Sequence, residues 1–263
     1  MRRWPQWRTR SGLLVRKRLA AAFFVPASLC VAALAVTGAT PPPTIFDSYH
    51  AAMGQRKAPA NMEFVYTVTR SGPNRIVTEQ HRVYWSSAGV ERNDTIAVNG
   101  TNLVPPRSSL LHRADWPYDV GQFVASGDDY DATVEGVAMV ANRKAYVLRL
   151  TRSAQADFTL TELYVDAATR MPLRQTFDVT GADCQGSGSI DFLPAGEYWL
   201  PTFVSVVCTG TATAGSTAPI FKEAIRFSGY RFPVAIPPDV FGATQSPATQ
   251  TPADTTVAPG ASP

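Results

Sequence analysis

The sequence is poor in the side chains that carry most enzymatic chemistry, with three histidines and three cysteines in 263 residues. His50, His81 and His112 are isolated, and none belongs to a short metal-ligand pattern. There is also no Gly-x-Ser-x-Gly nucleophile elbow and no glycine loop that could cradle a phosphate. We therefore expect no catalytic residue, no metal and no cofactor, and predict that the chain is not an enzyme.

Two local patterns resemble sites but favour simpler interpretations. Residues 186–189, Gly-Ser-Gly-Ser, precede a predicted strand rather than a helix, which indicates a bend or a bulge. Residues 128–131, Asp-Asp-Tyr-Asp, could bind a hard cation through carboxylate oxygens, although a solvated acidic turn explains them better.

Acidic residues are missing from the first 39 positions. That segment contains seven basic residues before a mostly apolar run over residues 19–39, the layout of an export signal. Small residues at Thr37 and Ala39 favour cleavage after Ala39, and Ala33 with Ala35 offers a second choice. The run approaches the length that spans a membrane, so a retained amino-terminal anchor, with membrane contact, is the alternative.

Without that segment the chain is not basic. The whole sequence has 24 basic and 21 acidic residues, and removal of residues 1–39 leaves 17 basic residues and a net charge of −4. The basic footprint of a nucleic-acid-binding protein is absent, so we expect no nucleic-acid partner. We expect an exported protein that is periplasmic, extracellular or anchored on the outer face of the cytoplasmic membrane.

Composition divides the remainder into three parts. Residues 40–43 include three prolines and form a stiff spacer. Residues 242–263 consist almost entirely of Ala, Thr, Pro, Ser, Gln and Gly, which cannot bury enough apolar surface to offset chain entropy, so we predict a disordered tail. Residues 44–241 are then one folded domain with a core of its own.

The domain begins with one helix. Thr44 and Asp47 form a capping-box-like start, and Gly54 and then Pro59 mark the end. An apolar stripe on one face should pack against the rest of the domain; its members are Ile45, Phe46, Tyr49, Ala52 and Met53.

After the helix, apolar residues alternate with polar ones and short Gly, Asn, Asp and Pro turns separate the runs, as in hairpins. No strand-helix-strand repeat is present, which argues against a parallel sheet. We predict a mainly β fold: a strongly curved antiparallel sheet, an unclosed barrel, with the single helix on its concave side. Residues 101–129, rich in proline and polar groups, should form a long loop or flap. The predicted strands are residues 64–69, 76–86, 90–98, 130–140, 144–151, 159–165, 173–180, 188–192, 199–208, 221–227 and, less regularly, 230–232.

Two cysteines, Cys184 and Cys208, remain after the export segment. If residues 188–192 and 199–208 form a hairpin around residues 194–197, opposite positions have numbers that sum to 391 or 392, as those of the two cysteines do. In an oxidising compartment this predicts a structural disulfide. Two buried free thiols are the alternative.

Aromatic residues make up 10% of the chain, and a curved sheet can enclose either a packed core or an apolar cavity. Periodicity does not distinguish the two. If a cavity exists, the inward-facing residues that would bind an apolar ligand are Phe64, Tyr66, Val68, Tyr146, Leu148, Leu150, Phe177, Ile190 and Phe192.

Three segments resemble the periplasmic lipoprotein-localisation-factor superfamily, which includes LolA/LolB-type carriers and the related regulator RseB. Residues 163–174, Leu-Tyr-Val-Asp-Ala-Ala-Thr-Arg-Met-Pro-Leu-Arg, are similar to a hairpin typical of that superfamily. Residues 199–202, Trp-Leu-Pro-Thr, look like the start of its next hairpin, and residues 227–232 with 237–241 look like its terminal strand and exit.

The resemblance implies an unclosed barrel with a helical lid and an interior for acyl chains or a hydrophobic partner. It gives no position for the lid-latching arginine that some carriers use, and no ligand residue is carried over. We therefore predict a non-catalytic binding protein of the cell envelope for a lipid, a lipoprotein or another apolar ligand. The alternative is an envelope sensor or scaffold that binds a protein through the sheet rim without taking up lipid.

Overall fold

The computed structural model describes residues 44–112, 116, 118–181, 184–210, 218 and 220–242. The chain divides into two units, Met1–Pro43 and Thr44–Pro263, and every described residue belongs to the second. The predicted export segment, the spacer and residues 243–263 of the predicted tail lie outside the described residues. Within the described part, no helix has the length and apolarity to cross a bilayer.

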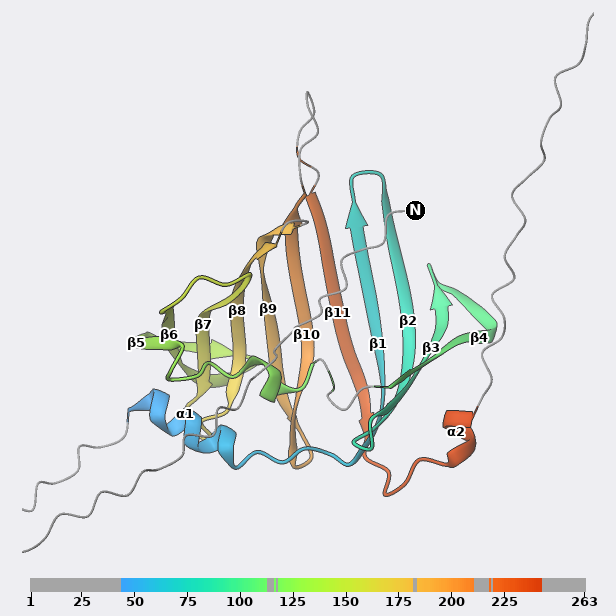
Figure 1. Ribbon diagram of the computed structural model, residues 1–263, viewed down its shortest axis with the longest axis horizontal. Coiled ribbons are helices and arrows are strands. Elements are labelled where there is room, and N and C mark those ends of the chain that lie inside the picture. Colours follow the sequence, from blue (N-terminus) through green and yellow to red (C-terminus); the bar gives the residue numbers. More distant parts are fainter. Residues whose placement is uncertain are drawn as a thin grey trace, which may run out of the picture. The chain divides into compact units, whose positions relative to one another are not determined.

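The described residues form one antiparallel sheet of eleven strands, in the order β4-β3-β2-β1-β11-β10-β9-β8-β7-β6-β5. The sheet is curved and does not close (Figure 1). This confirms the predicted fold class. The strands are β1 Asn61–Gly72, β2 Arg75–Ser86, β3 Val90–Val98, β4 Thr101–His112, β5 Tyr130–Val140, β6 Arg143–Arg152, β7 Phe158–Asp166, β8 Pro172–Gly181, β9 Cys184–Ala195, β10 Tyr198–Thr209 and β11 Ile220–Arg231.

The strand order contains two hairpin meanders, β1–β4 and β5–β11, which meet where β1 pairs with β11. This places β4 at one edge of the sheet and β5 at the other, although they are consecutive in the chain. The connection between them must therefore cross the sheet from edge to edge. Its described part, which includes the 3-10 helix η1 (Val120–Phe123), passes over the same face as α1 (Figure 1).

Helix α1, Ile45–Gly54, begins as the sequence predicts. The Thr44 hydroxyl accepts a hydrogen bond from the Asp47 amide at 3.0 Å, and the Asp47 carboxylate accepts one from the Thr44 amide at 3.0 Å. Tyr49 and Met53, from the predicted apolar stripe, are fully buried. A second, five-residue helix, α2 at Pro238–Gly242, was not predicted.

The prediction of a loop over residues 101–129 is wrong for its first part, because Thr101–His112 forms strand β4. Pro105 and Pro106 suggested a loop, since proline cannot donate to a sheet ladder. β4 is an edge strand, and its pairing with β3 is interrupted where the two prolines lie, between Arg107 opposite Thr95 and Asn102 opposite Ala97.

The glycines at 186 and 188 do not make a bend or bulge. Both lie inside the regular β9–β10 and β8–β9 ladders. A Cβ on Gly186 would lie 1.8 Å from the carbonyl oxygen of Val207, and one on Gly188 would lie 2.4 Å from the Phe177 ring. Glycine is therefore required by the close approach of neighbouring backbone and ring atoms.

The predicted disulfide between Cys184 and Cys208 is present, with a Cα–Cα distance of 5.1 Å. The pairing was correct but the register was off by two residues, because Cys208 lies opposite Gly186 rather than Cys184. A register shift between Pro201 and Phe203 separates this part of the hairpin from its turn. The bridge joins β9 and β10 diagonally.

Candidate binding site on the concave face

The nine residues predicted to face inward all belong to one apolar cluster. Seven are buried, with Phe64, Leu148 and Phe192 no more than 1% exposed. Tyr66 and Tyr146 are partly buried, and the Arg170 guanidinium lies 5.1 Å from the centre of the Tyr146 ring. All nine therefore pack in or against the core, and their role in binding a ligand stays a prediction.

Two segments cover this face, and we call them the cover: α1 and residues 118–125. Their own side chains complete the core, since Tyr49, Met53, Val120 and Ala125 are buried. Phe123 packs against Phe158 of β7, with ring centres 6.0 Å apart. Most of the contact between the cover and the sheet is therefore apolar.

Few polar contacts fix the cover in the described structure. The Tyr49 hydroxyl accepts a hydrogen bond from the Ala125 amide at 3.3 Å, which joins the two parts of the cover. The fully buried side chain of Gln175 on β8 donates to the Phe123 carbonyl at 2.8 Å, which joins the cover to the sheet. Burial raises the pKa of Tyr49 above its usual range, so its hydroxyl stays protonated.

An arginine links the two parts of the cover. The Arg56 guanidinium, just beyond α1, lies 3.3 Å from the carboxylate of Asp119. It also passes over Gly121, where an added Cβ would lie 1.9 Å from the guanidinium. This contact could not be predicted from the sequence, because Arg56 and Asp119 are 63 residues apart.

Beside the cover, a cavity of about 140 Å³ remains between β1, β2, β3 and β11. Five of its lining residues are aromatic. Their rings contact one another, for example Phe64 and Trp116 at 5.2 Å and Tyr118 and Phe227 at 5.1 Å between ring centres. The lining residues are Phe64, Tyr66, Val83, Glu91, Asn93, Trp116, Tyr118 and Phe227.

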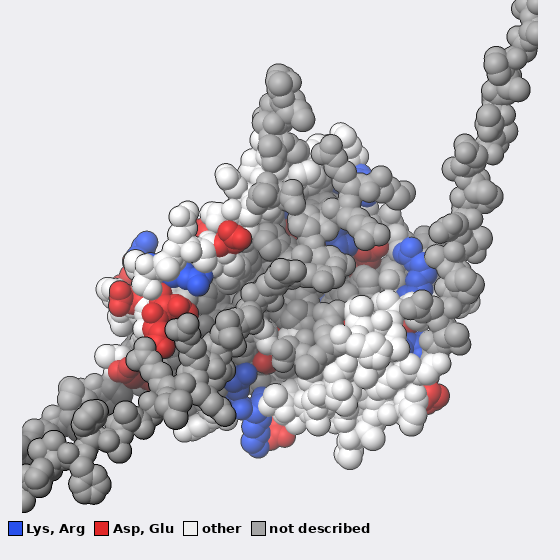
Figure 2. Space-filling model, viewed as in Figure 1, with Lys and Arg blue, Asp and Glu red and all other residues white. Residues whose placement is uncertain are grey.

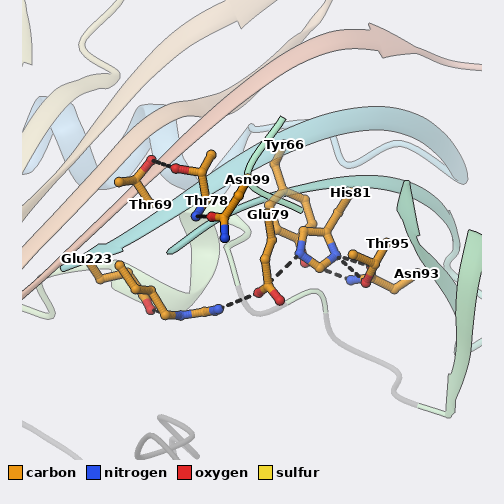
Figure 3. A network of polar contacts seen from close by, with 10 residues as sticks. Tyr66, Thr69, Thr78, Glu79, His81, Asn93, Thr95, Asn99 and Glu223 are labelled. Carbon is orange, nitrogen blue, oxygen red and sulfur yellow. Dashed lines mark hydrogen bonds and ion pairs between the residues drawn. The ribbon is translucent and has the colours of Figure 1, made fainter. Parts of the chain in front are cut away.

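The polar wall of this cavity continues into a network on the same face (Figure 3). Asn93 donates to the Tyr66 hydroxyl at 2.8 Å, and its side-chain oxygen lies 2.9 Å from Nδ1 of His81. The His81 ring stacks on Tyr66 at 4.5 Å. Beyond them, Arg70 bonds to the carboxylate of Glu79 at 2.6 Å.

Burial sets the protonation of this network. It raises the pKa of Tyr66 to about 12 and lowers the pKa of His81, so both side chains are neutral near pH 7. The sequence analysis found His81 isolated and outside any metal-ligand pattern. The structure places it in a partly buried polar network, a placement that the sequence could not give because Asn93 comes from another strand.

Six residues that line the cavity were not among those predicted for the site: Val83, Glu91, Asn93, Trp116, Tyr118 and Phe227. Trp116 and Tyr118 belong to the segment predicted as a flap. They reach β1 only because the connection between β4 and β5 crosses the sheet. Residues 128 and 129 are exposed at a turn, as a solvated acidic turn requires. Within the described ranges, no group of three or more His, Cys, Asp or Glu side chains could hold a metal.

No family model and no curated protein matches the sequence. The chain is similar to the structure of a LolA superfamily protein from Nitrosomonas europaea, with 14% identity, 76% of this chain and 98% of that chain covered, and a TM-score of 0.39. It is also similar to an outer membrane lipoprotein-sorting protein domain from Vibrio parahaemolyticus, with 12% identity, 74% of this chain and 95% of that chain covered, and a TM-score of 0.41. A third similar structure is the complex of MucA and MucB from Pseudomonas aeruginosa, with 14% identity, 73% of this chain and 98% of that chain covered, and a TM-score of 0.25.

Proposed function

We propose that the chain is an exported, non-catalytic binding protein that holds an apolar ligand, an acyl lipid or a lipoprotein, on the concave face of its sheet. One observation carries the proposal: the apolar concave face is covered by α1 and residues 118–125 rather than by a second sheet. The described cavity of about 140 Å³ is smaller than a long acyl chain, so a lipid must replace part of the cover.

The cover suits such an exchange. Its side chains are apolar where they meet the sheet, so an acyl chain in the same place would bury the same apolar surface. The Arg56–Asp119 pair is about one-quarter to one-third exposed, and ion pairs of this kind contribute at most about 1 kcal/mol. An apolar ligand could therefore displace the cover without breaking a strong polar network.

The experiment is lipid extraction from the purified full chain, followed by mass spectrometry. We expect acyl lipid in near-stoichiometric amount with the wild-type chain. Leu148→Gln places a polar amide at a buried inward position of β6 and should reduce the lipid content severalfold. Thr133→Gln, a matched change on the edge strand β5, should leave it unchanged. If the folded protein, purified from several expression hosts, carries no lipid, the proposal is contradicted.

A second candidate, an envelope sensor or scaffold that binds a protein through the sheet rim, is favoured by the β5 edge. Val134, Val137 and Met139 are more than half exposed there, and β5 has no strand partner on its outer side among the described residues. An unpaired edge can accept a strand from another protein. Loss of a co-purifying envelope protein in Val137→Lys, with lipid content unchanged, would support this candidate.

A further inference from the structure

The two edges of the sheet differ in how well they can accept a further strand. At the β4 edge, Pro105 and Pro106 lie where the pairing with β3 is interrupted, and prolines at an edge keep other strands from pairing with it. Strand β5, at the other end of the sheet (Figure 1), contains no proline and has no strand partner on its outer side in the described part of the chain. The β5 edge is therefore the one that a further strand can join.

A bulge in the middle of β5 sets the direction of its side chains. The register between β5 and β6 shifts between Val134 and Gly136, so Glu135 is the extra residue of the bulge. In a regular strand, residues three apart point to opposite faces. Across this bulge, Val134 and Val137 point to the same face, since their partners on β6 both belong to the apolar cluster. That face is the concave one.

The concave side of the β5 edge carries an exposed aliphatic row, which consists of Val134, Val137 and Met139. These side chains are 52%, 55% and 67% exposed. The other face of the same strand is polar, with Thr133 and Glu135 both exposed. A strand that joins β5 would remove the aliphatic row from water, which is favourable if the new strand is apolar on the same face.

The bulge selects a second copy of β5 as that strand. A regular strand matches the aliphatic row only on one side of the bulge, because its side chains change face at every residue. A second copy has the same bulge. If the two copies run antiparallel about a two-fold axis at the bulge, Val134 lies opposite Val137 of the second copy and Ala132 lies opposite its Met139. Apolar residues then meet apolar residues on both sides of the axis.

The charges at the two ends of β5 favour the same arrangement. Asp128, Asp129 and Asp131 are exposed at its start, whereas the exposed Lys144 lies opposite Met139 near its end. Figure 2 shows side chains of both signs at the end of the sheet where β5 lies. An antiparallel pair brings the acidic start of each copy toward the basic end of the other.

We propose that two copies of this chain pair through their β5 strands, antiparallel and about a two-fold axis at the bulge, to form one continuous sheet. The proposal goes beyond the proposed function, because it concerns the outer edge of the sheet and not the ligand of the concave face. It also assigns the β5 edge to a second copy instead of an envelope protein. The two aliphatic rows form one apolar seam between the two concave faces.

The first measurement is the mass of the purified full chain by light scattering at several concentrations. We expect a dimer whose fraction rises with concentration, since an interface along one strand is small. Val137→Lys places a charge in the seam from both copies and should weaken the dimer at least about tenfold. Val104→Lys makes the same change at the β4 edge, where Val104 is 92% exposed, and should leave the dimer unchanged.

Pairs of cysteines test the register without a disruptive variant. In Val134→Cys with Val137→Cys, each new cysteine lies opposite one of the second copy, within the distance that a disulfide bridges. Mild oxidation should therefore give a covalent dimer on a non-reducing gel. In the control, Ala132→Cys with Val134→Cys, the new cysteines lie about 10 Å or more from those of the second copy, so little covalent dimer should form.

Three results would overturn the proposal: a chain that is monomeric at every concentration, a dimer that Val137→Lys leaves intact, and equal cross-linking of the two cysteine pairs. A monomeric chain that loses a co-purifying envelope protein in Val137→Lys would also overturn it, and would assign the edge to that protein. A monomeric chain that still carries acyl lipid would refute this inference and leave the proposed function standing.

Discussion

At the scale of single residues, two glycines in β9 have a steric role. A side chain at position 186 would meet the Val207 backbone at 1.8 Å, and backbone atoms cannot move aside as the end of a flexible side chain can. We expect Gly186→Ala to reduce the free energy of unfolding by about 1–3 kcal/mol through overpacking. Urea denaturation measures this. Gly54→Ala, where no atom lies within 4 Å of the added Cβ, should change it little, and equal effects would contradict the prediction.

His81 gives a second prediction at this scale, on pH. Burial lowers the pKa of His81 below its usual 6.5, so the unfolded chain binds more protons than the folded chain as the pH falls below that value. The contribution to stability is therefore complete above pH 6.5 and is lost as the pH falls toward the lowered pKa. Between about pH 7.5 and pH 5.5, the wild-type chain should lose more stability than His81→Gln.

Urea denaturation at the two pH values tests this difference. All other residues are common to the wild-type chain and His81→Gln, so the difference between the two losses reports the change at position 81. Identical losses in the two chains would show that the folded and unfolded states hold this proton equally.

At the scale of elements, the disulfide ties β9 to β10 across 24 residues of chain. Loss of a bridge that closes a loop of this size typically costs about 2–4 kcal/mol. We expect Cys184→Ser with Cys208→Ser to lower stability by that amount in urea denaturation. Added reductant should destabilise the wild-type chain to the same degree and leave the double variant unaffected. A wild-type chain insensitive to reductant while unfolded would contradict a bridge in solution.

The cover gives the next prediction. Because the Tyr49 hydroxyl accepts the Ala125 amide, Tyr49→Phe should speed hydrogen exchange at Ala125 by about tenfold, the effect of one lost hydrogen bond. The amide of Leu160 donates to the Tyr130 hydroxyl at 3.1 Å and is a control in the same spectrum. Faster exchange at both amides would indicate global destabilisation rather than a loosened cover.

Most elements could be predicted because their causes are local. The capping box at Thr44 and the turn residues between alternating runs involve neighbours in sequence, so α1 and ten of the strands follow from the sequence. Strand β4 was missed because its prolines are tolerated on an edge strand, at an interruption of the pairing with β3, and both features depend on the arrangement of the whole sheet. The Arg56–Asp119 contact and the position of Trp116 in the cavity wall were also missed. Both depend on where the connection between β4 and β5 crosses the sheet.

At the scale of the whole molecule, we propose that the chain is exported. The segment that predicts export lies outside the described residues, so experiment must test it. We expect amino-terminal sequencing of the mature chain to begin at Thr40, because small residues at Thr37 and Ala39 suit cleavage after Ala39. Mass spectrometry of the membrane fraction checks the same point. Full-length chain held in that fraction would identify the segment as a retained anchor.

The seam between β1 and β11 has a consequence for how the chain matures. Residue pairs such as Tyr66 and Phe227 join the two meanders, and the two residues of each pair are synthesised far apart in time. Until β11 has been synthesised, β1 and β10 each leave one edge without its strand partner. Chains truncated before residue 220 should therefore aggregate, and quality-control proteases should degrade them much faster than the complete protein.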